Sequence, residues 1–175
     1  MTPVSEFRDD IPRGGLLRAV SVLACGLGLL QTNGVDGNAG LTIGTDPTKV
    51  ASGSATTYRI DGTVYSLPAT DNFWTLIGAP VPASSWQKYA LLVDTESSSS
   101  VVAGESSNVS AARVKLAPLG TTGGQAVIGT LTVATAADTT FKPGIDALNA
   151  PGVTATFTSG VDTAAMIRSV GAIGL

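Results

Sequence analysis

Hydrophobic and polar residues alternate through much of the chain between residues 71 and 158, and glycine and serine separate the alternating runs. In the clearest run, Val127, Leu131 and Val133 lie on one side of a two-residue period, and the intervening threonines lie on the other. Residues 153–157 repeat the pattern, with valine, alanine and phenylalanine opposite threonines. Because the branched side chain of threonine fits a pleated strand while its hydroxyl stays hydrated, these runs predict antiparallel strands with one solvated face.

The same pattern, divided by turn residues, predicts further strands. Asp61 and Gly62 stand between the β-prone runs 58–60 and 63–65, which indicates a hairpin with a type I′ turn, since that turn requires positive φ at both central residues. Other strands are predicted at residues 41–44, 72–76, 86–94, 100–103, 112–116, 125–134 and 152–158. Prolines fall between these runs, where they disturb no ladder. The predicted fold is therefore mainly β: an antiparallel β-sandwich or barrel, jelly-roll-like in type.

The N-terminal region has a different pattern. Residues 1–15 mix prolines, glycines and charges and are expected to form an extended arm. Residues 16–30 are expected to form a short helix, because five apolar side chains repeat with the spacing of a heptad seam: Leu16, Val20, Leu23, Leu27 and Leu30. The other sides of this helix are apolar as well, so the helix has to be buried. We predict that the five seam residues form an oligomerisation or docking interface.

Two other interpretations of residues 16–30 compete with a docking helix. A secretory signal peptide has an arginine-bearing start and an apolar core of this length, but we expect the segment to be retained. A membrane span has to cross roughly 30 Å of hydrocarbon. A helix over residues 16–30 reaches only about 22 Å, and Arg18 lies within it. We therefore prefer a docking helix and predict no membrane partner.

The sequence also predicts how the chain is divided. Residues 31–40 are rich in glycine and asparagine and are expected to form a linker. The linker divides the chain into an N-terminal region of residues 1–40, which mediates oligomerisation or docking, and a β domain of residues 41–175. Near the C-terminus, residues 162–168 are expected to start a helix with Asp162 as its N-cap.

Composition adds an argument about the surface. Of the 175 residues, 43% are hydrophobic and only 13% are charged, about half the usual share of charge. So few charges leave much of a monomer's surface without polar cover, which predicts that other subunits cover it, most simply as a homotrimer. The net charge of −3 and the sequence pI near 4.7 argue against a nucleic-acid partner, because such a partner requires a basic face.

Residues that carry catalysis or bind metals are scarce. The chain has no histidine and a single cysteine, Cys25, which excludes histidine-based triads, histidine-ligated metals and an intrachain disulfide. Asp94 and Glu96 alternate near a strand end, as a glycosidase pair would, but the adjacent serine run is typical of a solvated hairpin end. We predict no catalytic residue, no metal site and no cofactor, and hence that the protein is not an enzyme.

Aromatic residues suggest a different class of function. Trp74, Trp86 and Tyr89 would stack on a sugar if they were exposed, whereas tryptophans in a β domain more often fill the core. A carbohydrate-binding β module that uses Trp74 or Trp86 is therefore one alternative function.

Three stretches of the sequence carry a family resemblance. They are residues 58–94, which include Tyr-Arg-Ile-Asp-Gly and Asp-Asn-Phe-Trp-Thr-Leu, residues 128–144, and residues 152–157. In this order, between Leu41 and about Asp162, they resemble the small β-rich virion proteins of tailed bacteriophages, a group that includes capsid decoration (cement) and head-fibre proteins. The pattern consists of strands and turns, and it contains no functional residue that can be carried over.

The resemblance implies a structural role in the virion. It implies a decoration or cement protein on the outer capsid surface, whose partner is the major capsid protein and which stabilises the shell. The N-terminal arm and helix would then mediate attachment or trimerisation. The alternatives are a tail, fibre-base or head-fibre component, or the carbohydrate-binding module.

Overall fold

The structure, a computed structural model, describes residues 33–108 and 124–160. Within these two ranges the chain forms strands and no helix. The strands are β1 (Gly34–Val35), β2 (Leu41–Ile43), β3 (Lys49–Ser52), β4 (Thr56–Ile60), β5 (Thr63–Leu67), β6 (Thr70–Thr75), β7 (Trp86–Asp94), β8 (Ser99–Ala103), β9 (Gln125–Thr135) and β10 (Val153–Ser159). The prediction of a mainly β fold is confirmed. The predicted arm, seam helix, strand at 112–116 and helix at 162–168 lie outside the described residues.

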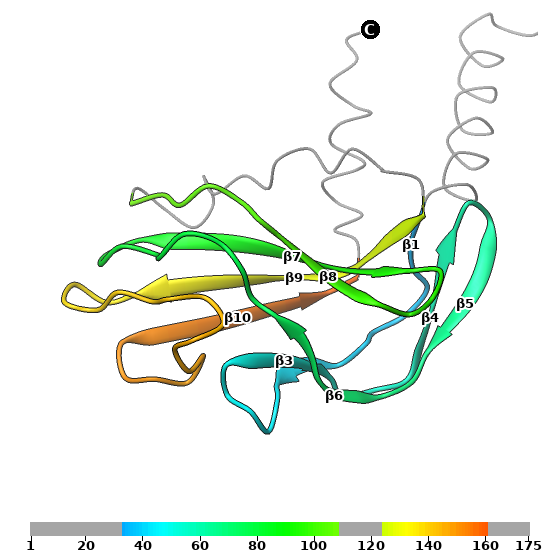
Figure 1. The fold of residues 1–175 in the computed structure, drawn as a ribbon, viewed down its shortest axis with the longest axis horizontal. Coiled ribbons are helices and arrows are strands. Elements are labelled where there is room, and N and C mark those ends of the chain that lie inside the picture. The colour runs from blue at the N-terminus through cyan, green and yellow to red at the C-terminus, as the bar shows by residue number, and fades with distance from the viewer. Residues whose placement is uncertain (1–32, 109–123, 161–175) are drawn as a thin grey trace, which may run out of the picture. The chain divides into compact units, whose positions relative to one another are not determined.

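The strands form three antiparallel sheets (Figure 1). A four-stranded sheet has the order β10-β9-β7-β8, and two three-stranded sheets have the orders β2-β3-β6 and β1-β4-β5. Hydrogen bonds join both edges of the four-stranded sheet to the sheet of β2, β3 and β6. Leu41 N of β2 donates to Ser159 Oγ of β10 at 3.4 Å, and Ser99 Oγ of β8 donates to Phe73 O of β6 at 2.7 Å. β2 therefore lies next to β10, and β6 lies next to β8.

The predicted hairpin is present as β4 and β5. Asp61 and Gly62 connect the two strands with φ values of 50° and 80°, both positive as a type I′ turn requires. Tyr58 and Tyr65 lie opposite each other and stack with ring centroids 5.5 Å apart. The Tyr58 hydroxyl donates to the carbonyl oxygen of Asp94 at 2.8 Å. This hydrogen bond fastens the hairpin to the end of β7.

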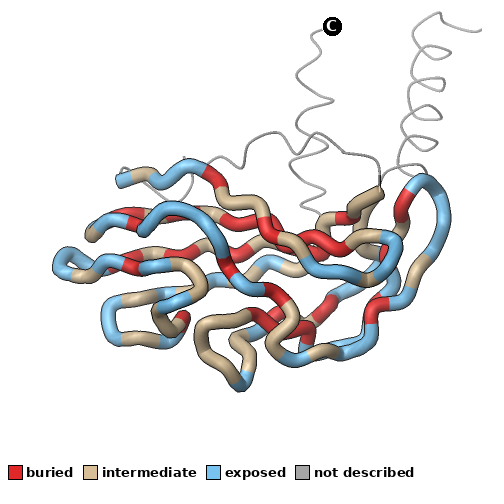
Figure 2. The backbone as a smooth tube through the Cα atoms, viewed as in Figure 1, coloured by how far each residue is buried: buried red, intermediate tan, exposed pale blue. Residues whose placement is uncertain are grey.

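The hydrophobic core lies between the sheets, and β7 is its central strand. Buried residues run along β7 and β9, and the five consecutive residues 89–93 are all buried (Figure 2). Trp74 of β6 is fully buried, and its indole N–H donates to Leu92 O of β7 at 2.9 Å. Its ring meets that of Phe73 edge-on, with centroids 4.6 Å apart. Trp74 thus ties the sheet of β6 to β7 through the core.

The buried face of β9 changes at a β-bulge, which corrects one sequence prediction. The pairing of β9 with β7 slips by one residue at Ile128. After the bulge, Leu131 and Val133 are buried as predicted, but before it Ala126 and Ile128 are buried and Val127 is only half-buried. The prediction that Val127 shares the buried face with Leu131 and Val133 is therefore wrong, because one inserted residue reverses the alternation.

Gly129 lies at this bulge and allows two neighbours to approach closely. A β-carbon added there would lie 2.5 Å from Leu41 Cδ1 and 2.5 Å from the carbonyl oxygen of Thr158. We expect Gly129→Ala to lower the free energy of unfolding by about 1–3 kcal/mol in denaturant titrations, because the backbone of β10 has to move. Gly62→Asn is the control, since nothing lies within 4 Å of an added β-carbon there and asparagine tolerates the positive φ. An equal loss in both variants would contradict the steric explanation.

The remaining strands show where periodicity is informative. β10 follows its prediction, with Val153, Ala155 and Phe157 packed against the core and the threonines between them exposed. β1 lies in the segment expected to be a linker, where it pairs with β4. β3 has no predicted counterpart. Both missed strands are short, and β3 carries one large apolar side chain, Val50, so neither shows a readable alternation.

Candidate interaction surface

Threonines cover the outer face of β9 and β10, the side turned away from the core. We call them the threonine face: Thr130, Thr132, Thr154, Thr156 and Thr158. The three on β10 are exposed, and the two on β9 are half-buried. The register places Thr158 opposite Thr130 and Thr156 opposite Thr132. Because directly opposite β-carbons lie about 4.5–5.5 Å apart, the hydroxyls form two adjacent rows.

Two residues of β7 extend the threonine face. Lys88 lies opposite Thr132, and Trp86 lies opposite Ala134, both half-buried. The surface therefore presents hydroxyls, one ammonium group and one partly covered indole. Hydroxyls both donate and accept hydrogen bonds, and an indole ring stacks, but none of these groups is an effective general base at neutral pH. The chemistry of this face is that of binding by hydrogen bonds and contact area.

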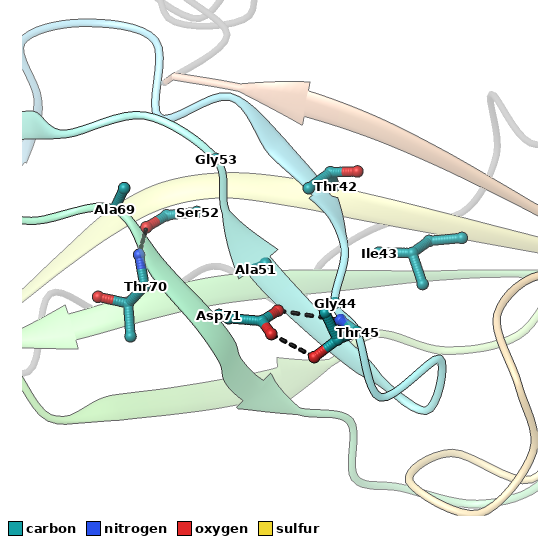
Figure 3. Close-up of a pocket in the computed structure, with 10 residues that line it drawn as sticks. All are labelled: Thr42, Ile43, Gly44, Thr45, Ala51, Ser52, Gly53, Ala69, Thr70 and Asp71. Atoms are coloured by element: carbon teal, nitrogen blue, oxygen red, sulfur yellow. Dashed lines mark hydrogen bonds between the residues drawn. The ribbon is translucent and has the colours of Figure 1, made fainter.

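A shallow pocket of about 430 Å³ lies on another sheet, over β2, β3 and β6 (Figure 3). Its carboxylate is that of Asp71, and Figure 3 shows both Asp71 oxygens directed at Thr45. The amide N–H of Thr45 donates to Asp71 Oδ1 at 3.0 Å, and the Thr45 hydroxyl donates to Asp71 Oδ2. The amide of Asn72 donates to Oδ1 as well, at 2.9 Å. Because both carboxylate oxygens are already engaged by the protein, the pocket is better explained as a braced corner than as a ligand site.

The braced corner continues to Asp46. The side-chain oxygen of Asn72, a residue with a positive φ of 54°, accepts from the amide of Asp46 at 2.8 Å. Asp46 in turn accepts from the amide and the hydroxyl of Thr48, at 3.0 and 2.8 Å. Hydrogen bonds from Thr48 hold the pKa of Asp46 below its ordinary value, and those from Thr45 do the same for the pKa of Asp71. These contacts fasten the β2–β3 turn to β6.

Removal of the Asp71 charge is expected to destabilise the fold in a pH-dependent way. The ordinary pKa of the carboxyl is 3.8 and its folded-state pKa is lower, so its contribution to stability is complete above the ordinary value and disappears as pH falls through the folded-state pKa. Asp71→Asn should therefore unfold more readily than the parent at pH 7, and the gap should close in acid. Thermal unfolding of both proteins between pH 7 and 2 measures this. A gap that does not change with pH would show that the shape of the side chain matters and its charge does not.

The structure separates the other residues that the sequence singled out. The seam residues Leu16, Val20, Leu23, Leu27 and Leu30 all lie outside the described ranges, so the predicted interface remains a prediction. Asp94 and Glu96 lie at the turn between β7 and β8. Asp94 Oδ1 accepts from the amides of Glu96 and Ser98 at 2.9 and 2.8 Å, which closes the turn between β7 and β8. The interpretation as a hairpin end is confirmed.

Two of the three candidate stacking aromatics are inside the protein. Trp74 and Tyr89 are fully buried, and only Trp86 is partly accessible. The Tyr89 hydroxyl donates to Gln87 Oε1 at 3.1 Å, and Gln87 Nε2 donates to Gly104 O at 2.8 Å. Burial raises the pKa of Tyr89. Of the aromatics proposed for sugar binding, Trp86 alone is left at a surface.

The described residues and the comparisons limit what else can be assigned. Within residues 33–108 and 124–160, no group of three or more acidic or cysteine side chains is arranged to hold a metal ion. The same two ranges contain no helix that is long and apolar enough to cross a membrane. No protein-family model, characterised protein or solved structure matches this chain.

Proposed function

We propose that the protein is a structural component of a bacteriophage particle, a capsid decoration (cement) protein on the outer capsid surface that binds the major capsid protein and stabilises the shell. The observation that carries the proposal is the threonine face, an array of uncharged hydroxyls on the outer side of β9 and β10, next to a strand edge with which no described strand pairs. The sequence resemblance between Leu41 and about Asp162 supplies the virion context.

The threonine face suits contact with another protein. Its exposed hydroxyls donate and accept hydrogen bonds without carrying charge, so they require no opposite charge on the partner. Interfaces of this kind gain stability from hydrogen bonds and from apolar area, at about 25 cal/mol per Å² of apolar surface removed from water. Many copies bound to one shell would add these contributions across neighbouring capsid subunits.

The proposal assigns separate tasks to the two parts of the chain. The sheets of the described residues are interpreted as an antiparallel sandwich of jelly-roll-like type, which presents the threonine face. The N-terminal arm and seam helix are assigned to trimerisation or to attachment. A homotrimer bound at a threefold or quasi-threefold position would engage several capsid subunits at once. No nucleic acid, membrane or cofactor takes part in this proposal, and no catalysis is proposed.

A three-dimensional map of the particle that carries the protein tests the location. Density over the shell at threefold or quasi-threefold positions is the expected result. Density on the tail axis, at a fibre base or along a head fibre would contradict the decoration role and support a tail, fibre-base or head-fibre component.

A second candidate function is carbohydrate binding, and the partly accessible Trp86 beside Lys88 favours it. An indole stacks on a sugar ring while neighbouring hydroxyls bond to it. Titration of the purified protein against soluble glycans, compared with Trp86→Ala, tests this function. Saturable binding that disappears in the variant would support it.

A further inference from the structure

β10 is an edge strand without the features that normally protect an edge. It pairs with β9 over seven consecutive residues, from Val153 opposite Thr135 to Ser159 opposite Gly129, with no bulge. Among the described residues, no strand pairs with its other side. The two ends of β10 are already in contact, since the Val153 N–H donates to Ala150 O at 3.0 Å and Ser159 Oγ accepts from Leu41 N of β2 at 3.4 Å, which leaves residues 154–158 as the open part of the edge. Edge strands are usually protected by charged side chains, proline, a bulge or short length. The sequence of β10, Val-Thr-Ala-Thr-Phe-Thr-Ser, contains no charge and no proline.

The side chains of β10 are arranged so that the strand complements itself. If two copies pair antiparallel about Thr156, all seven residues of each strand overlap, and Thr154 of one copy faces Thr158 of the other. Ala155 then faces Phe157, a small side chain opposite a large one, on the side that packs against the core. Residue pairs of this register join threonine to threonine on the outer side, so the threonine face becomes continuous across both copies. A two-fold axis through Thr156 satisfies every one of these pairings.

Other centres of pairing are poorer. A shift by one residue along the strand turns each outward threonine toward the inner side of its partner, because side chains alternate with a period of two. A two-fold axis at Ala155 or at Phe157 keeps the faces aligned but leaves two residues at one end of each strand unpaired. The centre at Thr156 gives the longest ladder.

The edge strand β5 provides a comparison within the same protein. β5 has five residues, and Pro68 follows it directly, which limits any added ladder. Self-pairing about Tyr65 would place Thr63 opposite Leu67 and Val64 opposite Ser66, so every pair beside the axis would join a polar to an apolar side chain. In β10 only the terminal pair, Val153 opposite Ser159, does so. The two edges thus differ in length, in protection and in self-complementarity.

We infer that the outer edge of β10, with which no described strand pairs, is a self-association site, at which a second copy of this chain adds its own β10 antiparallel about a two-fold axis at Thr156. Such strand addition gains main-chain hydrogen bonds along the edge, while alternate side chains set the register. The inference does not rest on the proposed function, because it concerns the purified protein in any role. On a particle, the same contact would join neighbouring copies to one another.

Cysteine cross-linking in the full chain tests both the site and the register. In a Cys25→Ser background, Thr156→Cys places two thiols at the two-fold axis, with Cα atoms about 4.5–5.5 Å apart, a separation that a disulfide spans. Thr154→Cys alone places its two copies about 13 Å apart, which a disulfide does not span. A mixture of Thr154→Cys with Thr158→Cys brings these positions together again. Mild oxidation followed by non-reducing electrophoresis and mass spectrometry reads out the linked pairs.

The expected result is specific to the register. Thr156→Cys should cross-link about a thousandfold faster than Val64→Cys, an exposed control on β5, because docking raises the local thiol concentration from micromolar to millimolar. The Thr154→Cys and Thr158→Cys mixture should cross-link as a mixed pair, and Thr154→Cys alone should not. Equal rates for Thr156→Cys and Val64→Cys would overturn the inference. So would fast linkage of Thr154→Cys to itself.

A second variant tests the contact without a thiol. Thr156→Lys places two ammonium groups opposite each other at the axis, where like charges weaken strand pairing. Thr156 is exposed, so the folded domain should tolerate the change, and circular dichroism should match that of the parent. Sedimentation of the full chain should show at least a twofold fall in the mass of the assembly. An unchanged mass of the assembly would overturn the inference. Failure of the Thr156→Cys variant to cross-link, because residues 1–15 pair with β10 in place of a second copy, would overturn it as well.

Discussion

Trp74→Ala is expected to lower the free energy of unfolding by about 3–5 kcal/mol, the largest loss from any single replacement considered in the described domain. The indole is fully buried, so its removal leaves a cavity in the core between the sheets. The hydrogen bond from Trp74 Nε1 to Leu92 O, 2.9 Å long, is lost as well. Equilibrium unfolding in denaturant, followed by fluorescence and circular dichroism, measures the change.

Trp86→Ala is the matched control, because it removes the same side chain from a half-buried position on the outer face. The free energy of unfolding should fall by less than half as much as in Trp74→Ala, since less buried apolar area is removed and no core volume is emptied. Trp74→Phe separates packing from hydrogen bonding: it keeps most of the ring volume and loses the N–H, and we expect a loss of about 1–3 kcal/mol. Equal losses for the two alanine variants would mean that Trp74 does not link the sheets.

Local sequence patterns were sufficient to predict much of the fold. β7, the hairpin of β4 and β5, and β10 lie within a residue or two of their predicted ranges, because each has either strong alternation or an Asp-Gly turn. Strand alternation and turn preferences depend on a few neighbouring residues, so the sequence predicts them without knowledge of the partner strand. The order of the strands within the sheets is a different matter. It depends on contacts between residues far apart in the chain, such as Leu41 with Ser159.

The errors of sequence reasoning have physical causes as well. The bulge at Ile128 is set by how β9 meets β7, and an alternation count within β9 alone cannot show it. Trp74 and Trp86 look alike in the sequence, yet one is buried between sheets and the other lies on the outer face. The bracing of Asp71 by Thr45 joins residues 26 positions apart. The bulge, the burial of Trp74 and the hydrogen bonds to Asp71 all depend on contacts between segments that are distant in the sequence.

The sequence predicts part of the threonine face. Alternate threonines in residues 128–133 and 153–158 indicate two solvated strand faces, but the sequence does not state that the two strands are neighbours. Only the register of β9 with β10 turns two rows into one array. The edge position of β10 is likewise a property of the sheet order. The interface that the sequence predicts is the seam at residues 16–30, because an apolar helix is the more conspicuous signal; it lies outside the described residues and stays a prediction.

Replacement of Leu23 and Leu27 with aspartate is expected to abolish attachment to the capsid or trimerisation, while the β domain keeps its fold. In the proposed function these two seam residues are buried against another chain, and burial of two unpaired carboxylates costs several kcal/mol. A loss of that size weakens binding by more than about a hundredfold. Separation of the chains avoids the cost, so loss of assembly is expected rather than unfolding.

Leu23→Met with Leu27→Met is the matched control, because it changes the same two positions and keeps them apolar; it should assemble as the parent does. Co-sedimentation with capsid shells and sedimentation of the free protein measure attachment and assembly, and circular dichroism reports the β domain. A double aspartate variant that attaches normally would show that the seam is peripheral to the interface. One that loses its β signal would place the seam in the domain's own core. Because the threonine face and the β10 edge lie entirely within residues 124–160, the Thr156 pairing should survive the aspartate substitutions, and this separates the two proposed contacts.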